Sequence, residues 1–125
     1  MDEDSSRGIE RIIARIEPGW PEAIDVGPGW HPLLSRLDQR LSVIAPRYVV
    51  QQVKAKFGAL SFFARPSEDV YDHSEEFRDA ILAAEWESTT TCEECGASAR
   101  TYTIRMWVWA LCERHARAKA EISDD

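Results

Sequence analysis

Isoleucine residues near the N-terminus recur with the spacing of an amphipathic helix. They occupy positions i, i+3, i+4 and i+7, on one face of a helix, and they are Ile9, Ile12, Ile13 and Ile16. Ser6 precedes them as a candidate N-cap, and Pro18 with Gly19 ends the pattern. The pattern predicts a first helix that begins at Ser6 and packs its isoleucine face on a core.

A second helix is predicted by apolar residues that recur at helical spacing until Pro46: Leu33, Leu34, Leu37, Leu41 and Ile44. Residues 18 to 32, between the two helices, are rich in proline and glycine and predict a loop. Trp20 and Trp30 in this loop each follow a turn signal. Each indole either binds a partner or packs on the core, and its large apolar area favours packing.

Residues 47 to 65 change to the period of a β-hairpin. The strand formers before the predicted turn at Phe57 and Gly58 are Tyr48, Val49, Val50 and Val53, and those after it are Leu60, Phe62 and Phe63. Asp72 and Glu75 then form the pattern of a capping box. It predicts a third helix with one apolar face, made of Phe77, Ala80, Ile81, Ala84 and Ser88.

These elements predict an α+β fold. A chain of 125 residues is long enough for one compact domain with a small appended element. We expect an α+β core over residues 1 to 88, a zinc-binding module packed on it over residues 89 to 122, and a tail over residues 123 to 125. The expected core residues are Leu37, Leu41, Val53, Leu60, Phe62, Phe77 and Ile81.

The chemistry of the chain concentrates in its C-terminal part. Cys92 and Cys95, and then Cys112 and His115, form two pairs with two-residue spacers, and they include all three cysteines. Each spacer allows one tight turn to present two ligands to the same ion, which predicts a tetrahedral Zn²⁺ site. Four protein ligands leave no open position for water, so the expected zinc is structural.

The sequence around these ligands resembles a treble-clef zinc finger. Gly96 follows the first pair as in a knuckle turn, and the second pair opens a helical run from Glu113 to Ala120. Between the pairs, alternate positions carry strand-forming residues: Tyr102, Ile104, Met106 and Val108. The core of this module is expected to include Ile104 and Leu111.

Other uses of the cysteines fit less well. A disulfide leaves one cysteine over, and a thioredoxin-like motif needs a βαβ context that is missing here. A zinc-deaminase pattern would take His73, Cys92 and Cys95 as ligands and Glu75 as proton carrier. That pattern has proline where this chain has Thr91, and it leaves Cys112 and His115 unused.

The formal charge of −7 is unevenly distributed. Residues 66 to 88 carry eight acidic residues and one basic residue. Nucleic-acid-binding domains usually show the opposite balance, so nucleic acid is disfavoured as a partner. No apolar run is long enough for a membrane span, and the acidic N-terminus does not match a secretory signal. We therefore expect no membrane contact and a cytoplasmic protein.

Four strings of the sequence are similar to a family of small uncharacterised bacterial and phage proteins: residues 29 to 33 (GWHPL), 52 to 62 (QVKAKFGALSF), 92 to 96 (CEECG) and 111 to 115 (LCERH). Members typically carry a Gly-Trp-x-Pro-Leu start, a Val-Lys-x-Lys-Phe-Gly hairpin and the same four ligands. The resemblance implies the zinc site and names no activity.

The leading hypothesis for function is a non-enzymatic, acidic interaction protein, such as an immunity protein or a phage inhibitor. It would capture a partner protein with a basic surface by electrostatic steering. Its expected contact residues are Glu75, Glu76, Asp79, Trp20 and Trp30. The alternative is a nucleic-acid-binding or regulatory zinc module that uses Arg105, Arg114, Arg117 and Lys119. A deaminase-like enzyme is the third hypothesis.

Overall fold

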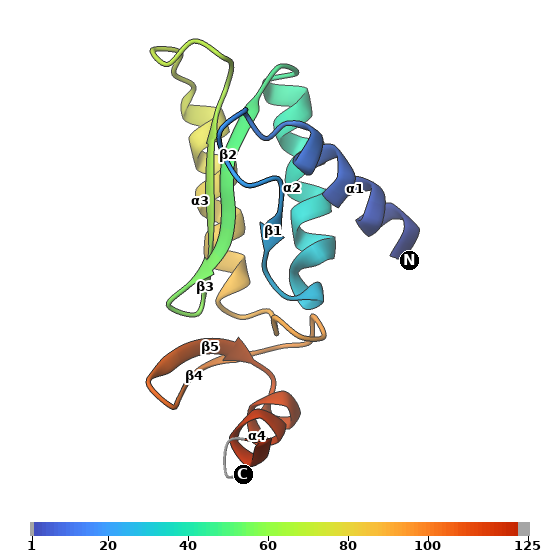
Figure 1. Ribbon diagram of the computed structural model, residues 1–125, viewed down its shortest axis with the longest axis vertical. Coiled ribbons are helices and arrows are strands. Elements are labelled where there is room, and N and C mark those ends of the chain that lie inside the picture. The colour runs from blue at the N-terminus through green and yellow to red at the C-terminus, as the bar shows by residue number, and fades with distance from the viewer. Residues whose placement is uncertain (1, 123–125) are drawn as a thin grey trace.

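The computed structural model describes residues 2–122 and has the expected α+β architecture (Figure 1). A larger N-terminal part contains three helices and a three-stranded sheet, and a hairpin with a fourth helix follows. The elements are α1 (Asp2–Ala14), β1 (Ile24–Asp25), the short 3₁₀ helix η1 (Pro28–Trp30), α2 (His31–Ile44), β2 (Val49–Lys56), β3 (Ala59–Arg65), α3 (Glu75–Ser88), β4 (Arg100–Ile104), β5 (Trp107–Leu111) and α4 (Glu113–Ile122).

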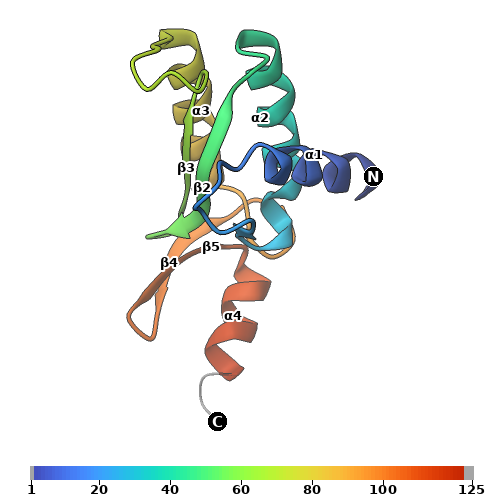
Figure 2. The same cartoon turned by 45° about the horizontal axis from the view of Figure 1, so that its top comes forward.

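Helices α1 and α2 cross at close range (Figure 2). A side-chain carbon at Gly8 would lie 2.4 Å from the hydroxyl oxygen of Ser35, so glycine permits the close approach. The prediction that Ser6 caps the first helix is wrong, because α1 begins at Asp2. The helix dipole favours an acidic residue in the first turn, such as Asp4, which explains why the helix begins before Ser6.

A buried carboxylate connects α1, α2 and the start of β2. Asp38 is 1% exposed. It accepts hydrogen bonds from Nε of Arg11 at 2.8 Å and from the hydroxyl of Tyr48 at 2.6 Å. The guanidinium of Arg15 lies 3.9 Å from the centre of the Tyr48 ring and donates to the Tyr48 carbonyl at 2.8 Å. Burial, followed by the bond to Asp38, raises the pKa of Tyr48.

The predicted hairpin is present, with its turn at Phe57 and Gly58. Both residues have positive φ, 55° and 78°, as a two-residue hairpin turn requires. Strand β2 pairs antiparallel with β3, and the register shifts between Val50 and Gln52. On its other side β2 pairs with β1, in parallel. This two-residue strand was predicted to be part of a loop. So short a segment carries no periodic pattern from which a strand could be predicted.

Helix α3 covers the outer edge of β3. The backbone N–H of Leu60 donates to Oγ of Ser88 at 2.8 Å, and that of Phe62 donates to a carboxylate oxygen of Glu85 at 2.9 Å. These side chains replace a neighbouring strand at two positions of the sheet edge, a place where unpaired groups otherwise promote aggregation.

The apolar face predicted for α3 is confirmed at all five positions, but its predicted cap is wrong. Oγ of Ser74 accepts from the N–H of Phe77 at 3.2 Å and caps the helix. Asp72 instead accepts a hydrogen bond from Ser67. Two overlapping patterns of polar residues precede this helix, and the one closer to it forms the cap.

The core comprises a large cluster and a small one. The seven expected core residues of the N-terminal part are all buried in the large cluster, which also contains Trp30 and Ala110. The small cluster lies under the C-terminal hairpin and includes Leu111 and Ile104, as expected. Because Ala110 comes from β5, the hairpin shares the larger core, and the domain boundary at residue 88 stays a prediction.

One expectation for the C-terminal hairpin is wrong. Met106 was expected to continue a strand, but it lies in the turn with φ of 68° and is 94% exposed. The alternation of residues 102 to 108 crosses a turn, and a period of two in the sequence does not reveal where a hairpin reverses. Between Asp2 and Ile122, no helix is both long and apolar enough to cross a membrane.

The Asp38 cluster generates a first prediction. Asp38→Ala should lower the free energy of unfolding by about 3 to 5 kcal/mol, because Tyr48 and Arg11 lose their buried acceptor and Arg15 loses an ion pair at 3.8 Å. Tyr48→Phe should cost only about 1 kcal/mol, since Asp38 keeps its arginines. Urea denaturation measures both, and similar losses for the two variants would contradict this role of Asp38.

Candidate metal centre

The four predicted ligands come together where three segments meet: the knuckle (residues 92 to 96), the second hairpin (β4 and β5) and α4. Cys92 and Cys95 flank the turn that follows α3, Cys112 directly precedes α4, and His115 lies in the first turn of α4. The four ligand atoms lie within 4.8 Å of one another. They could hold a metal ion, as their spacing predicted.

The knuckle has a defined backbone structure. The N–H of Cys92 donates to the carbonyl of Ala97 at 2.7 Å, and the N–H of Gly96 donates to the carbonyl of Cys92 at 2.8 Å. Gly96 has φ of 83°, a conformation that glycine adopts without strain. This tight turn points both thiols toward α4.

Three distances within the group are close to those of a tetrahedral ligand set. The sulfurs of Cys95 and Cys112 are 3.8 Å apart. Nδ1 of His115 lies 3.2 Å from the sulfur of Cys112 and 3.7 Å from that of Cys92. A tetrahedral zinc ion with bonds of ~2.3 Å to sulfur and ~2.0 Å to nitrogen requires separations of about 3.8 Å between sulfurs and about 3.5 Å between sulfur and nitrogen. The residues present therefore fit a metal of this kind.

The position of Cys112 at the N-terminus of α4 favours its thiolate form. The backbone N–H of His115 points at its sulfur at 3.5 Å. That N–H, with the His115 ring and the neighbouring thiols, lowers the pKa of Cys112 to about 6. For Cys95, the N–H of Ala97 favours the thiolate, but burial and the adjacent sulfurs outweigh it and raise the pKa.

The loop at residues 27 to 30 docks directly on the knuckle. The indole N–H of Trp30 donates to the carbonyl of Thr91 at 2.8 Å. The N–H of Gly29 donates to the carbonyl of Glu93 at 2.7 Å, and that of Gly27 donates to the Glu93 carboxylate at 2.9 Å. Glu93 is buried, and this burial raises its pKa although the Gly27 N–H opposes the shift. The metal group is thus joined to the N-terminal part by backbone and side-chain hydrogen bonds.

Gly29 is placed where no side chain fits. A Cβ there would lie 2.1 Å from the carbonyl oxygen of Cys92 and 2.7 Å from the amide nitrogen of Cys95. A second close contact joins the first hairpin to β5, since a Cβ at Gly58 would lie 3.0 Å from a methyl carbon of Val108. The knuckle and β5 therefore both pack on backbone of the N-terminal part.

No protein-family model matches the sequence, and no curated protein or solved structure is significantly similar to it. The resemblance to small bacterial and phage proteins therefore rests on the quoted strings alone. In the structure the string at 29 to 33 meets the one at 92 to 96, where Gly29 packs on the backbone of Cys92 and Cys95. The turn at Gly58 meets Val108 of β5, the strand that leads to Cys112.

The structure separates the proposed contact residues into three groups. Trp30 is 0% exposed, so its assignment to partner binding is wrong and its packing on the core is confirmed. Trp20 is 42% exposed, and its role stays a prediction. Glu75, Glu76 and Asp79 are all exposed on α3, and their role in binding also stays a prediction.

His73 and Glu75 do not belong to the metal group. They lie beside and at the start of α3, at the end of the molecule opposite the C-terminal hairpin and α4 (Figure 1). Among residues 2–122, the His, Cys, Asp and Glu side chains that gather as potential ligands are those of Cys92, Cys95, Cys112 and His115. The ligand set of the deaminase hypothesis is therefore not assembled.

The sequence predicted no role for Leu82 and Trp86, two apolar residues that lie one turn apart on the exposed side of α3. Phe63 lies on β3 as predicted, but its exposure was not predicted. The two α3 residues could have been found, because they fall outside the buried stripe of that helix. The role of Gly29 has no such signal, since its contact partner lies more than 60 positions away in the chain.

Trp107 and Trp109 lie on the same face of β5, with their ring centres 6.3 Å apart. Trp109 packs in the small C-terminal cluster, whereas Trp107 is 58% exposed. Lys119 of α4 lies over the Trp109 ring at 4.0 Å, so this face of β5 turns toward α4.

The docking of the loop generates a second prediction. Gly29→Ala should force the loop off the knuckle, weaken metal binding and lower the free energy of unfolding by about 1 to 3 kcal/mol. Gly19→Ala is the control, because a Cβ at that position would meet no atom within 4 Å. Its φ of 100° strains the backbone at that position, so this variant can lose stability but should keep its metal affinity. A competition titration with Co²⁺ as probe measures the affinity. Equal affinities of the two variants would show that docking does not support the metal group.

Proposed function

We propose that this protein is a non-enzymatic interaction protein of the immunity or inhibitor type, which captures a basic partner protein and contains a structural Zn²⁺. The observation that carries the proposal is the exposed side of α3, where acidic and apolar residues lie next to each other. The proposed role of the zinc ion is structural: it stabilises the fold of the C-terminal module.

The donor set supports zinc as the metal. Three thiolates and one imidazole are soft to borderline ligands, which Zn²⁺ prefers over oxygen-rich sites. Bound zinc would supply no reactive water here, because the four side chains complete its coordination. Its contribution is to stabilise a module whose own apolar cluster is small, and structural zinc sites supply such folding free energy directly.

A third prediction concerns the metal. Elemental analysis should find one Zn²⁺ per chain, and Cys112→Ser should lose it. His73→Ala is the control and should keep its zinc. Hydrogen exchange after chelation should show loss of protection first in residues 89 to 122 and in the loop at 27 to 30 that docks on them. Zinc loss in His73→Ala, but not in His115→Ala, would overturn the assignment.

The surface of α3 supports capture of a basic protein. Glu75, Asp79, Leu82 and Trp86 follow one another along the exposed side of the helix, and Trp86 is 79% exposed. Acidic side chains accelerate the encounter with a basic partner. Apolar and aromatic side chains beside them supply affinity after contact, as hot-spot residues do in other interfaces.

The fourth prediction is a change in association rate. A triple charge reversal, Glu75→Lys with Glu76→Lys and Asp79→Lys, should slow association with the purified partner by roughly tenfold or more at low salt and flatten its salt dependence. The control reverses three exposed acids elsewhere, Glu10, Glu22 and Glu121. Stopped-flow fluorescence measures the rates, and equal rates for the two triple variants would remove the α3 surface from the proposal.

The hypothesis of nucleic-acid binding has less support. Of its four basic residues, Arg117 lies 3.6 Å from Glu113 and Lys119 lies 3.6 Å from Glu94. These acids reduce the positive charge available to phosphate groups. The feature that favours nucleic-acid binding is Arg105. It lies in a turn with positive φ, beside exposed Met106 and Trp107.

A further inference from the structure

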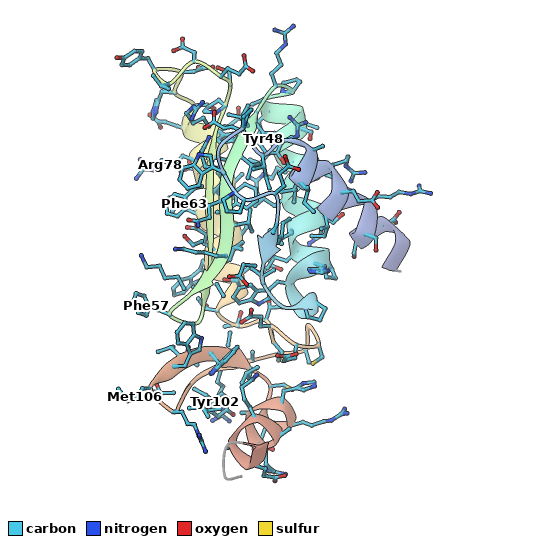
Figure 3. The ribbon with its side chains drawn as sticks, viewed as in Figure 1. Tyr48, Phe57, Phe63, Arg78, Tyr102 and Met106 are labelled. Atoms are coloured by element: carbon cyan, nitrogen blue, oxygen red, sulfur yellow. The ribbon has the colours of Figure 1, made fainter. Side chains whose placement is uncertain are left out.

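A groove with apolar walls lies along the border of β3, α3 and the loop that joins them. Its volume is about 370 Å³, within the size range of binding clefts. Phe63, Val70 and Leu82 contribute to its walls and are 51%, 63% and 48% exposed. Phe63 and Arg78 of the lining are seen on the same side of the molecule (Figure 3). Three large apolar side chains are thus available to a ligand at one place.

The groove also contains an open position of the sheet edge. In β3 the N–H groups of Leu60 and Phe62 point away from β2, toward α3. The alternation of a strand turns the N–H of Ala64 in the same direction, and Ala64 lines the groove. Helix α3 supplies Ser88 and Glu85 to the first two positions, but no described side chain accepts from Ala64. An extended ligand in the groove can therefore bond to the backbone there.

Charge around the groove indicates the kind of ligand. Asp72 and Glu85 line it, Glu68 and Asp69 lie in the adjoining loop, and further acids follow on α3. The basic side chains in the lining are Arg65, which is bound to Glu17 at 2.7 Å, and Arg78, with His73 beside them. Acids and bases are balanced in the lining itself, with Asp72 and Glu85 against Arg65 and Arg78. The excess of acid comes from the adjoining loop and the exposed side of α3, and it favours a basic ligand.

We infer that this groove receives an apolar side chain from an extended, basic segment of the partner protein. The inference rests on the proposed function and adds the place where the partner is anchored. Basic residues of the segment pair with the acids of α3 and the loop, while a leucine or phenylalanine enters between Phe63 and Leu82. A second copy of this chain is a poor occupant, since it would bring the same acidic surface against itself.

A titration of the zinc-loaded, full-length protein with a designed peptide tests this inference. The probe is a short capped peptide in which pairs of Lys and Arg flank a Leu-Phe-Leu centre. Amide NMR shifts should move at Phe63, Ala64, Val70 and Leu82. Leu82→Ser should weaken binding by roughly tenfold, as loss of a contact in an interface hot spot does. Val43→Ser is the matched control, because Val43 is 83% exposed on α2 and should leave binding unchanged.

Two control peptides separate the groove from the acidic surface. One keeps the basic flanks and has serine at its centre, and the other keeps the apolar centre and has glutamate flanks. Weaker binding of both supports the groove. Equal binding of the serine peptide, or equal binding by Leu82→Ser and wild type, overturns the groove but leaves the acidic capture surface intact. Failure of both basic peptides to bind overturns the proposed capture of a basic partner as well.

Discussion

The contact between Gly29 and the knuckle is the constraint on which the arrangement of this protein depends. Backbone meets backbone there, with no room for a side chain between the loop and the carbonyl of Cys92. The indole of Trp30 reaches past this contact to Thr91, so the loop contributes both to the large core and to the knuckle. A metal ion bound at the knuckle would therefore stabilise the joint between both parts, and not the C-terminal module alone.

The two ends of the molecule have different proposed roles, metal binding at one end and partner binding at the other. The metal ligands lie at the end formed by the second hairpin and α4, whereas the loop between β3 and α3 lies at the other (Figure 1). Helix α3 connects them, because its last turn leads into the knuckle and its first turn borders the groove. The surface of α3 is thus presented on a helix whose two ends are both fixed, by Ser74 at one and by the knuckle at the other.

The sequence predicted what depends on local patterns and missed what depends on distant contacts. The apolar stripe of α3, the hairpin turn at Gly58 and the four ligands all follow from spacing within short segments. Strand β1 was missed because two residues carry no period. Trp30 could be read as an interface residue because its partner Thr91 is 61 positions away. The cap at Ser74 was missed because Asp72 offers a competing pattern nearby.

The bond between Trp30 and Thr91 also fixes an order of events during synthesis of the chain. Domains generally begin to fold from the N-terminal side while the ribosome is still adding residues. The indole N–H of Trp30 obtains its acceptor only after the 61 residues up to Thr91 have been made, and the last metal ligand, His115, emerges later still. A nascent or truncated chain that ends before the knuckle consequently leaves the indole N–H of Trp30 without this acceptor, and the loop at 27 to 30 without the surface on which it docks.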